Sequence, residues 1–161
     1  MIVCGVDLGG RKVAISTFVD GELTNLSHLE VAKTTRAREL REIAEYTLDI
    51  TKVADYVFVE EPLVGRGVRA SMQVSQAAGA VLAALGGGVH EVKSALVPVG
   101  TWKKEVIGSG SANKDTVKDW LREAYPVYAT LCGSNQDRID ATCIGLYGVQ
   151  LIERADALDE L

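Results

Sequence analysis

The sequence predicts an α/β fold built on a mixed five-stranded sheet with helices on both faces. Three strand-like segments open the chain without a helix between them, and helices and strands alternate after residue 36. Strands joined by tight turns pair antiparallel, whereas a strand, a helix and a further strand give a parallel pairing. The chain has 161 residues, of which 47% are hydrophobic, enough for one core. We therefore expect a single domain over 1–155 and a short acidic tail over 156–161.

The antiparallel part comprises three strands, expected over 2–7, 12–19 and 22–32. Each segment is rich in the apolar and β-branched residues that favour strands. The pair Gly9-Gly10 allows a tight turn after the first strand, and Asp20-Gly21 is a strong hairpin signal after the second. The chain is thus predicted to begin with an antiparallel meander.

The remaining elements follow from helical periodicity, caps and breakers. They are a helix over 36–52, a strand over 55–60, a helix over 72–85, a strand over 89–99, a short helix over 100–107, and helices over 112–124 and 136–154. Ser71 and Ser111 are the expected caps of the helices that follow them, and Pro126 is expected to end the helix before it. In this order the first and fourth strands lie side by side and parallel, and sheets of this kind bind ligands beyond the carboxyl ends of such strands.

Four acidic residues occupy positions that this fold would bring together. Asp7 ends the first strand and Glu60 ends the fourth, while Asp137 and Asp140 lie three residues apart on one face of the last helix. Several carboxylates in one partly buried place are costly unless cations compensate their charge. We therefore expect a site for two divalent cations.

Alternative interpretations of these acids exist. A single Asp at a strand end is commonly a turn residue, and an Asp at a helix start is commonly a cap, so the combination carries the argument. Strand alternation favours Glu60, which shares a face with Phe58, but a shift of one residue would select Glu61.

The distribution of charge matters more than its total. The net charge of −5 argues mildly against nucleic acid, although two bound divalent cations would nearly neutralise it. No acid occurs from Pro62 to His90, and lysines dominate residues 102–118. Such segregation is expected where one face meets a polyanion. The candidate DNA-contacting residues are Lys103, Lys104, Lys114, Arg66 and Arg69.

These motifs together resemble the RuvC-type Holliday junction resolvases, in the phage-like branch of the RNase H superfamily. The resemblance spans about residues 2–150, and its most specific part is Gly108–Lys114. The matching segments are Gly5–Gly9, Val59–Glu61, Ser75–Gly79, Lys103–Lys114 and Asp137–Ala141.

The resemblance implies an RNase H-like fold and a homodimeric, magnesium-dependent endonuclease for four-way DNA junctions. It implies that Lys103 and Lys114 contact the junction, and that the dimer forms through the helix over 72–85. The implied catalytic acids are Asp7, Glu60, Asp137 and Asp140.

For the chemistry we hypothesise a two-metal phosphodiester hydrolysis with the Mg²⁺ that the resemblance implies, for which Mn²⁺ would substitute. Asp7 would bridge both ions, Glu60 and Asp140 would bind one each, and Asp137 would complete the site. The products would carry a 5′-phosphate and a 3′-hydroxyl.

Other functions remain open. The bacterial family places an aromatic residue after the catalytic Glu, whereas this chain has Leu63, which cannot stack on a base. A nuclease with a broader range of branched DNA, such as forks or flaps, is therefore an alternative. A non-catalytic nucleic-acid binding module of this fold would be expected to have lost an acid. The segment Val6–Lys12 also looks like the phosphate-binding start of sugar kinases, but those require two such domains.

The sequence also suggests a cellular setting. It shows no signal peptide and no run of about 18 apolar residues, so no membrane span is expected. The three cysteines lack metal-ligand spacing. These features fit a reducing cytosol, in a bacterium or a phage-infected host.

Overall fold

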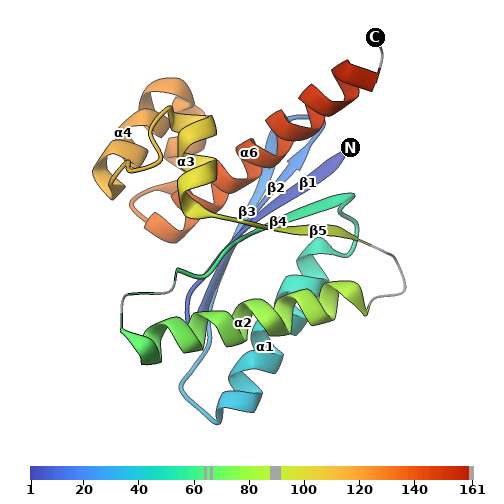
Figure 1. Cartoon of the computed structure of the whole chain (residues 1–161), viewed down its shortest axis with the longest axis vertical. Coiled ribbons are helices and arrows are strands. Elements are labelled where there is room, and N and C mark those ends of the chain that lie inside the picture. The colour runs from blue at the N-terminus through green and yellow to red at the C-terminus, as the bar shows by residue number, and fades with distance from the viewer. Residues whose placement is uncertain (64, 66, 88–91, 160–161) are drawn as a thin grey trace.

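The centre of the molecule is a five-stranded sheet with the strand order β3-β2-β1-β4-β5 (Figure 1). The computed structural model describes residues 1–63, 65, 67–87 and 92–159. Its strands are β1 (Ile2–Leu8), β2 (Lys12–Val19), β3 (Glu22–Glu30), β4 (Tyr56–Glu60) and β5 (Lys93–Val97). β2 pairs antiparallel with both β1 and β3, whereas β4 pairs parallel with β1 and with β5, which confirms the predicted mixed sheet.

Helices cover both faces of this sheet, as predicted. α1 and α2 lie on one face, and α6 with α3 lies on the other, where α4 and α5 pack beside the start of α6 (Figure 1). No helix among the described residues is long and apolar enough to cross a membrane. The helices are α1 (Arg36–Thr51), α2 (Val68–Gly86), α3 (Val99–Ile107), α4 (Lys114–Ala124), α5 (Pro126–Cys132) and α6 (Gln136–Asp159).

Strand alternation divides the apolar residues into two cores. On β1, the side chains of Cys4 and Val6 are fully buried in a cluster with Ile43 of α1 and Val81 of α2. Because successive side chains of a strand point to opposite faces, the odd-numbered residues of β1, such as Val3, face α6 instead.

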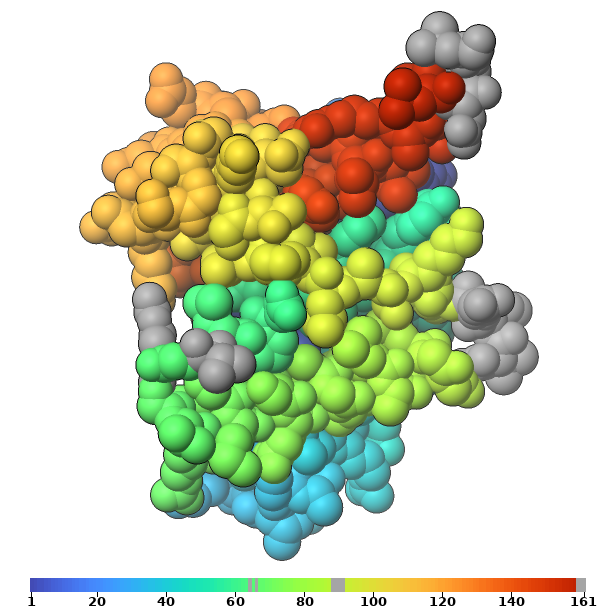
Figure 2. All heavy atoms as spheres, viewed as in Figure 1, coloured from blue at the N-terminus to red at the C-terminus, as the bar shows by residue number. Residues whose placement is uncertain are grey.

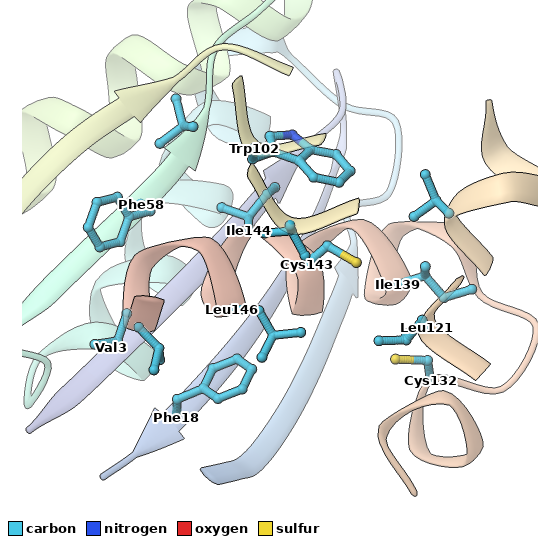
Figure 3. Close-up of a cluster of buried hydrophobic side chains, with 14 of the residues drawn as sticks. Val3, Phe18, Phe58, Trp102, Leu121, Cys132, Ile139, Cys143, Ile144 and Leu146 are labelled. Atoms are coloured by element: carbon cyan, nitrogen blue, oxygen red, sulfur yellow. The ribbon is translucent and has the colours of Figure 1, made fainter. Parts of the chain in front are cut away.

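The second core lies between the sheet and α6. Val3 of β1 and Phe58 of β4 pack there with Trp102 of α3 and Ile144 of α6 (Figure 3). Asp7 has the same parity along β1 as Val3, so its side chain also faces α6.

α6 contacts the strands with almost no side chain between the two backbones. A Cβ on Gly5 would lie 2.2 Å from the amide nitrogen of Gly145, and a Cβ on Gly145 would lie 2.4 Å from a ring carbon of Phe18. The buried hydroxyl of Ser16 donates a 2.7 Å hydrogen bond to the carbonyl oxygen of Ala141. These contacts hold the start of α6 close to the carboxyl end of β1.

The predicted start of α2 was wrong by one turn. The helix begins at Val68 with Gly67 at the N-cap, not after Ser71. The hydroxyl of Ser71 instead donates to the carbonyl oxygen of Leu63 at 3.1 Å, so it ties the helix to the preceding segment.

The predicted cap of α4 was also wrong. Asn113 caps this helix, because its Oδ1 accepts a 2.9 Å hydrogen bond from the amide of Thr116. Ser111 lies two residues outside the N-cap.

Three further boundaries differ from prediction. Pro126 begins α5, a helix that the sequence did not predict, since proline fits the first turn of a helix. α6 continues to Asp159, so residues 156–159 form its last turn and are not a separate tail.

β5 is shorter than the strand expected over 89–99, of which residues 89–91 lie outside the described part.

Candidate active site

Two of the candidate acids stand side by side at the carboxyl ends of neighbouring strands. The parallel register pairs Val6 of β1 with Val59 of β4, so Asp7 and Glu60 follow as the next pair. Both have the parity of the residues that face α6.

The N-terminal part of α6 adds two more carboxylates over this rim. Burial is the main cause that raises the pKa of Asp7 well above its usual value. Repulsion from Glu60, Asp140 and Asp137 raises this pKa further, while Lys114 lowers it. The four acids therefore share one electrostatic environment although they come from three distant parts of the chain.

Glu60 and Asp140 are each held by a side-chain donor. The indole Nε1 of Trp102 donates to Oε2 of Glu60 at 2.9 Å, and Nε2 of Gln136 donates to Oδ1 of Asp140 at 2.8 Å. Burial raises the pKa of both carboxyl groups. The two hydrogen bonds and the nearby Lys103 oppose this rise, because they favour the ionised form.

Asp137 makes its direct contacts away from the other acids. Its Oδ2 lies 3.3 Å from Nε2 of His28 on β3 and 4.0 Å from Nζ of Lys12 on β2. Neither His28 nor Lys12 could be predicted as a partner of Asp137 from the sequence, since only the docking of α6 on the sheet brings β2 and β3 near it. The hydrogen bond from Gln136 to Asp140 could have been predicted, because the two residues lie four apart on one helix.

The donor set of this site suits a hard cation. Asp7, Glu60 and Asp140 offer partly buried carboxylate oxygens, the ligands that Mg²⁺ prefers, and a cation would offset both their desolvation and their repulsion. Among the described residues, no group of three or more His, Cys, Asp or Glu side chains is yet arranged closely enough to hold an ion. One oxygen of Asp137 is engaged with His28.

Glu61 lies outside this cluster. Its side chain is exposed, and its backbone amide continues the strand pairing by donating to the carbonyl oxygen of Val97 at 2.9 Å. Glu60 is therefore the residue of the pair that faces Asp7.

Two of the candidate lysines lie beside the acids. Nζ of Lys103 donates to the carbonyl oxygen of Ala112 at 2.8 Å and lies 5.4 Å from the ring centre of Trp102. Lys114 is the exposed first residue of α4 and lowers the pKa of Asp7 and Asp140. Both charges therefore act on the carboxylate cluster.

The other basic candidates lie farther from this rim or outside the described part. Lys104 is exposed near the end of α3. Arg69 is exposed on α2 and borders a hollow of about 310 Å³ together with Lys33 and Arg36. Arg66 lies outside the described residues.

Comparison with known proteins relates this fold to solved resolvases. A scan against protein-family models and a search of curated proteins find no match. RuvC of Thermus thermophilus in complex with a Holliday junction substrate is 21% identical, with a TM-score of 0.81 over 96% of both chains. The yeast mitochondrial Holliday junction resolvase is 13% identical, with a TM-score of 0.58 over 99% of this chain and 84% of its own. The fowlpox virus resolvase with Holliday junction DNA is 17% identical, with a TM-score of 0.55 over 94% of this chain and 99% of its own. The chain therefore has the RNase H-like fold of these resolvases.

Asp7→Asn is expected to stabilise the cation-free protein at neutral pH. The raised pKa values of Asp7, Glu60 and Asp140 mean that the folded state keeps protons that the unfolded state has released. The resulting loss of stability is absent below about pH 4 and grows as the pH rises through the raised pKa values. In EDTA at pH 7, Asp7→Asn should melt higher, by about 2–4 °C for each 1 kcal/mol of desolvation and repulsion that it relieves.

Glu61→Gln is the matched control, because it removes a neighbouring but exposed carboxylate and should leave the melting temperature nearly unchanged. Adding Mg²⁺ should stabilise the unmodified protein more than Asp7→Asn. If Asp7→Asn melted lower than the unmodified protein in EDTA at pH 7, the charge cluster would not be a source of instability.

Proposed function

We propose that this protein is a structure-selective, magnesium-dependent DNA endonuclease that resolves four-way junctions. The observation that carries the proposal is the cluster of Asp7, Glu60 and Asp140 at the sheet rim, with Asp137 beside it. The fold shared with resolvases bound to junction DNA supports the choice of substrate.

The acids would act as ligands for two divalent cations. Asp7 is repelled by Glu60 and by both acids of α6, so it would bridge the ions, with Glu60 and Asp140 binding one each and Asp137 completing the set. Bound Mg²⁺ would supply activation of water and neutralisation of charge on the leaving oxygen. The chain itself would hold the scissile phosphate, since Lys114 and the amino end of α4 lie beside the cluster.

We expect cleavage of a synthetic four-way junction in Mg²⁺, and none in EDTA. Asp7→Asn should lower the cleavage rate by at least about 1,000-fold, because it removes the carboxylate shared by both ions. Glu61→Gln should cleave at close to the unmodified rate. Undiminished cleavage by Asp7→Asn would reject the assignment.

A nuclease for a wider range of branched DNA is the second candidate. The observation that favours it is Leu63, whose aliphatic side chain is 52% exposed where the bacterial family has an aromatic residue. Matched four-way, three-way, flap and linear substrates separate the two candidates. Comparable rates on flaps and four-way junctions would favour the broader activity.

Lys114 should contribute about one phosphate contact to junction binding. Lys114→Ala is expected to lower the slope of log affinity against log salt concentration by about 1. Binding can be measured with Ca²⁺ replacing Mg²⁺ to prevent cleavage. Lys52→Ala is the control, because Lys52 pairs with Asp49 at the end of α1. An unchanged slope in Lys114→Ala would remove this residue from the DNA interface.

We also propose that two copies pair through α2, the helix expected over 72–85. Its outer side is open to solvent (Figure 2). Exposed, uncharged residues form a stripe along it: Val68 is 79% and Met72 is 56% exposed, and Ser75 and Gly79 continue the stripe. An apolar stripe beside an open hollow of about 640 Å³ is typical of a helix that packs on a partner. Two sites related by a twofold axis would suit a substrate with two equivalent strands.

The unmodified protein should sediment as a dimer at micromolar concentration. Met72→Glu should shift it to a monomer, because a charge would be buried at the centre of the apolar stripe. Val127→Glu changes another exposed apolar residue, 67% accessible, on α5 and should leave the dimer intact. A monomeric unmodified protein, or a dimer unaffected by Met72→Glu, would exclude pairing through α2.

A further inference from the structure

Trp102 links the second hydrophobic core to the candidate active site. Its side chain is fully buried, with 0% of its surface exposed, among the residues packed between α3, α6 and the sheet (Figure 3). Its only polar atom, Nε1, donates to Oε2 of Glu60 at 2.9 Å. The indole therefore binds one carboxylate oxygen of the acidic cluster.

The acceptor of this indole is a carboxylate and not a backbone carbonyl. A buried tryptophan N–H needs a partner, and a neutral backbone carbonyl would satisfy it. Here the partner is the carboxylate of Glu60. Burial and the nearby Asp140 both disfavour the ionised form of this group.

The ring itself has little freedom to move. Packing holds it within the core, and Nζ of Lys103 lies 5.4 Å from its centre while donating to the carbonyl oxygen of Ala112. A donor fixed in this way imposes a direction on its acceptor, because a hydrogen bond weakens steeply away from linearity.

We infer that Trp102 is a positioning residue for Glu60: its indole N–H holds Oε2 and turns Oε1 toward the place of a divalent cation. The inference rests on the proposed function and adds a residue to it. The hydrogen bond sets the orientation of the carboxylate before a cation arrives, so less freedom is lost on binding. Trp102 touches neither cation nor DNA in this role.

Trp102→Phe tests the inference, since it keeps an aromatic ring and removes the N–H. The affinities for Mg²⁺ and Mn²⁺ are measured without DNA, from the rise of the melting temperature with cation concentration. Trp102→Phe should weaken binding about tenfold. Trp120→Phe is the matched control: this second tryptophan packs against Tyr125, 5.7 Å between ring centres, and its replacement should leave the cation affinity unchanged. Equal affinities in Trp102→Phe and the unmodified protein would overturn the inference.

A packing defect must be separated from lost positioning. Trp102→3-benzothienylalanine keeps the shape of the indole but lacks the N–H, and it should weaken cation binding as Trp102→Phe does. In a Glu60→Gln background, Trp102→Phe should cause no further loss of affinity, although it should still lower stability. The same loss of affinity in both backgrounds would show that Trp102 acts through packing and would reject the role.

The test also separates this inference from the proposed function. Cation binding by the unmodified protein with no change in Trp102→Phe overturns the positioning role alone. No binding of Mg²⁺ or Mn²⁺ by the unmodified protein overturns both.

Discussion

The direct packing of α6 on β1 and β2 is the constraint on which the rest of this structure depends. Gly5 and Gly145 allow the helix and strand backbones to touch, and Ser16 binds the carbonyl oxygen of Ala141 in the buried interface. Any side chain between these backbones would lift the helix from the sheet. Because Asp140 precedes Ala141 on α6, the same contacts set its position above the strand end that carries Asp7.

The cluster of acids formed in this way destabilises the folded chain. Burial and mutual repulsion raise the pKa values of Asp7, Glu60 and Asp140, so the folded chain bears a cost that it would not bear with amides at these positions. Hydrogen bonds from Trp102 and Gln136 recover part of this cost. Such a group of acids is expected at a cation site. Bound cations stabilise repelling carboxylates more than they would stabilise carboxylates that do not repel one another.

Much of the sheet and part of the site could be predicted from local patterns. Strand alternation correctly predicted that Glu60 shares a face of β4 with Phe58, because alternation is a property of the backbone alone. The start of α2 was misjudged, because Ser71 bonds to Leu63 and not to the helix end. Local signals identify groups able to cap a helix, but they do not tell which other acceptor lies within reach.

The sequence by itself determined the antiparallel start of the sheet, the parallel pairing of β1 with β4 and the face that Glu60 shares with Phe58. These follow from periodicity and chain connectivity, which are local properties. Only the tertiary structure decided that Trp102 meets Glu60 and that His28 meets Asp137. Those pairs are 42 and 109 residues apart in the chain, so they depend on how deeply α3 and α6 pack against the sheet. That depth is a result of side-chain volumes across the whole interface, which no single segment encodes.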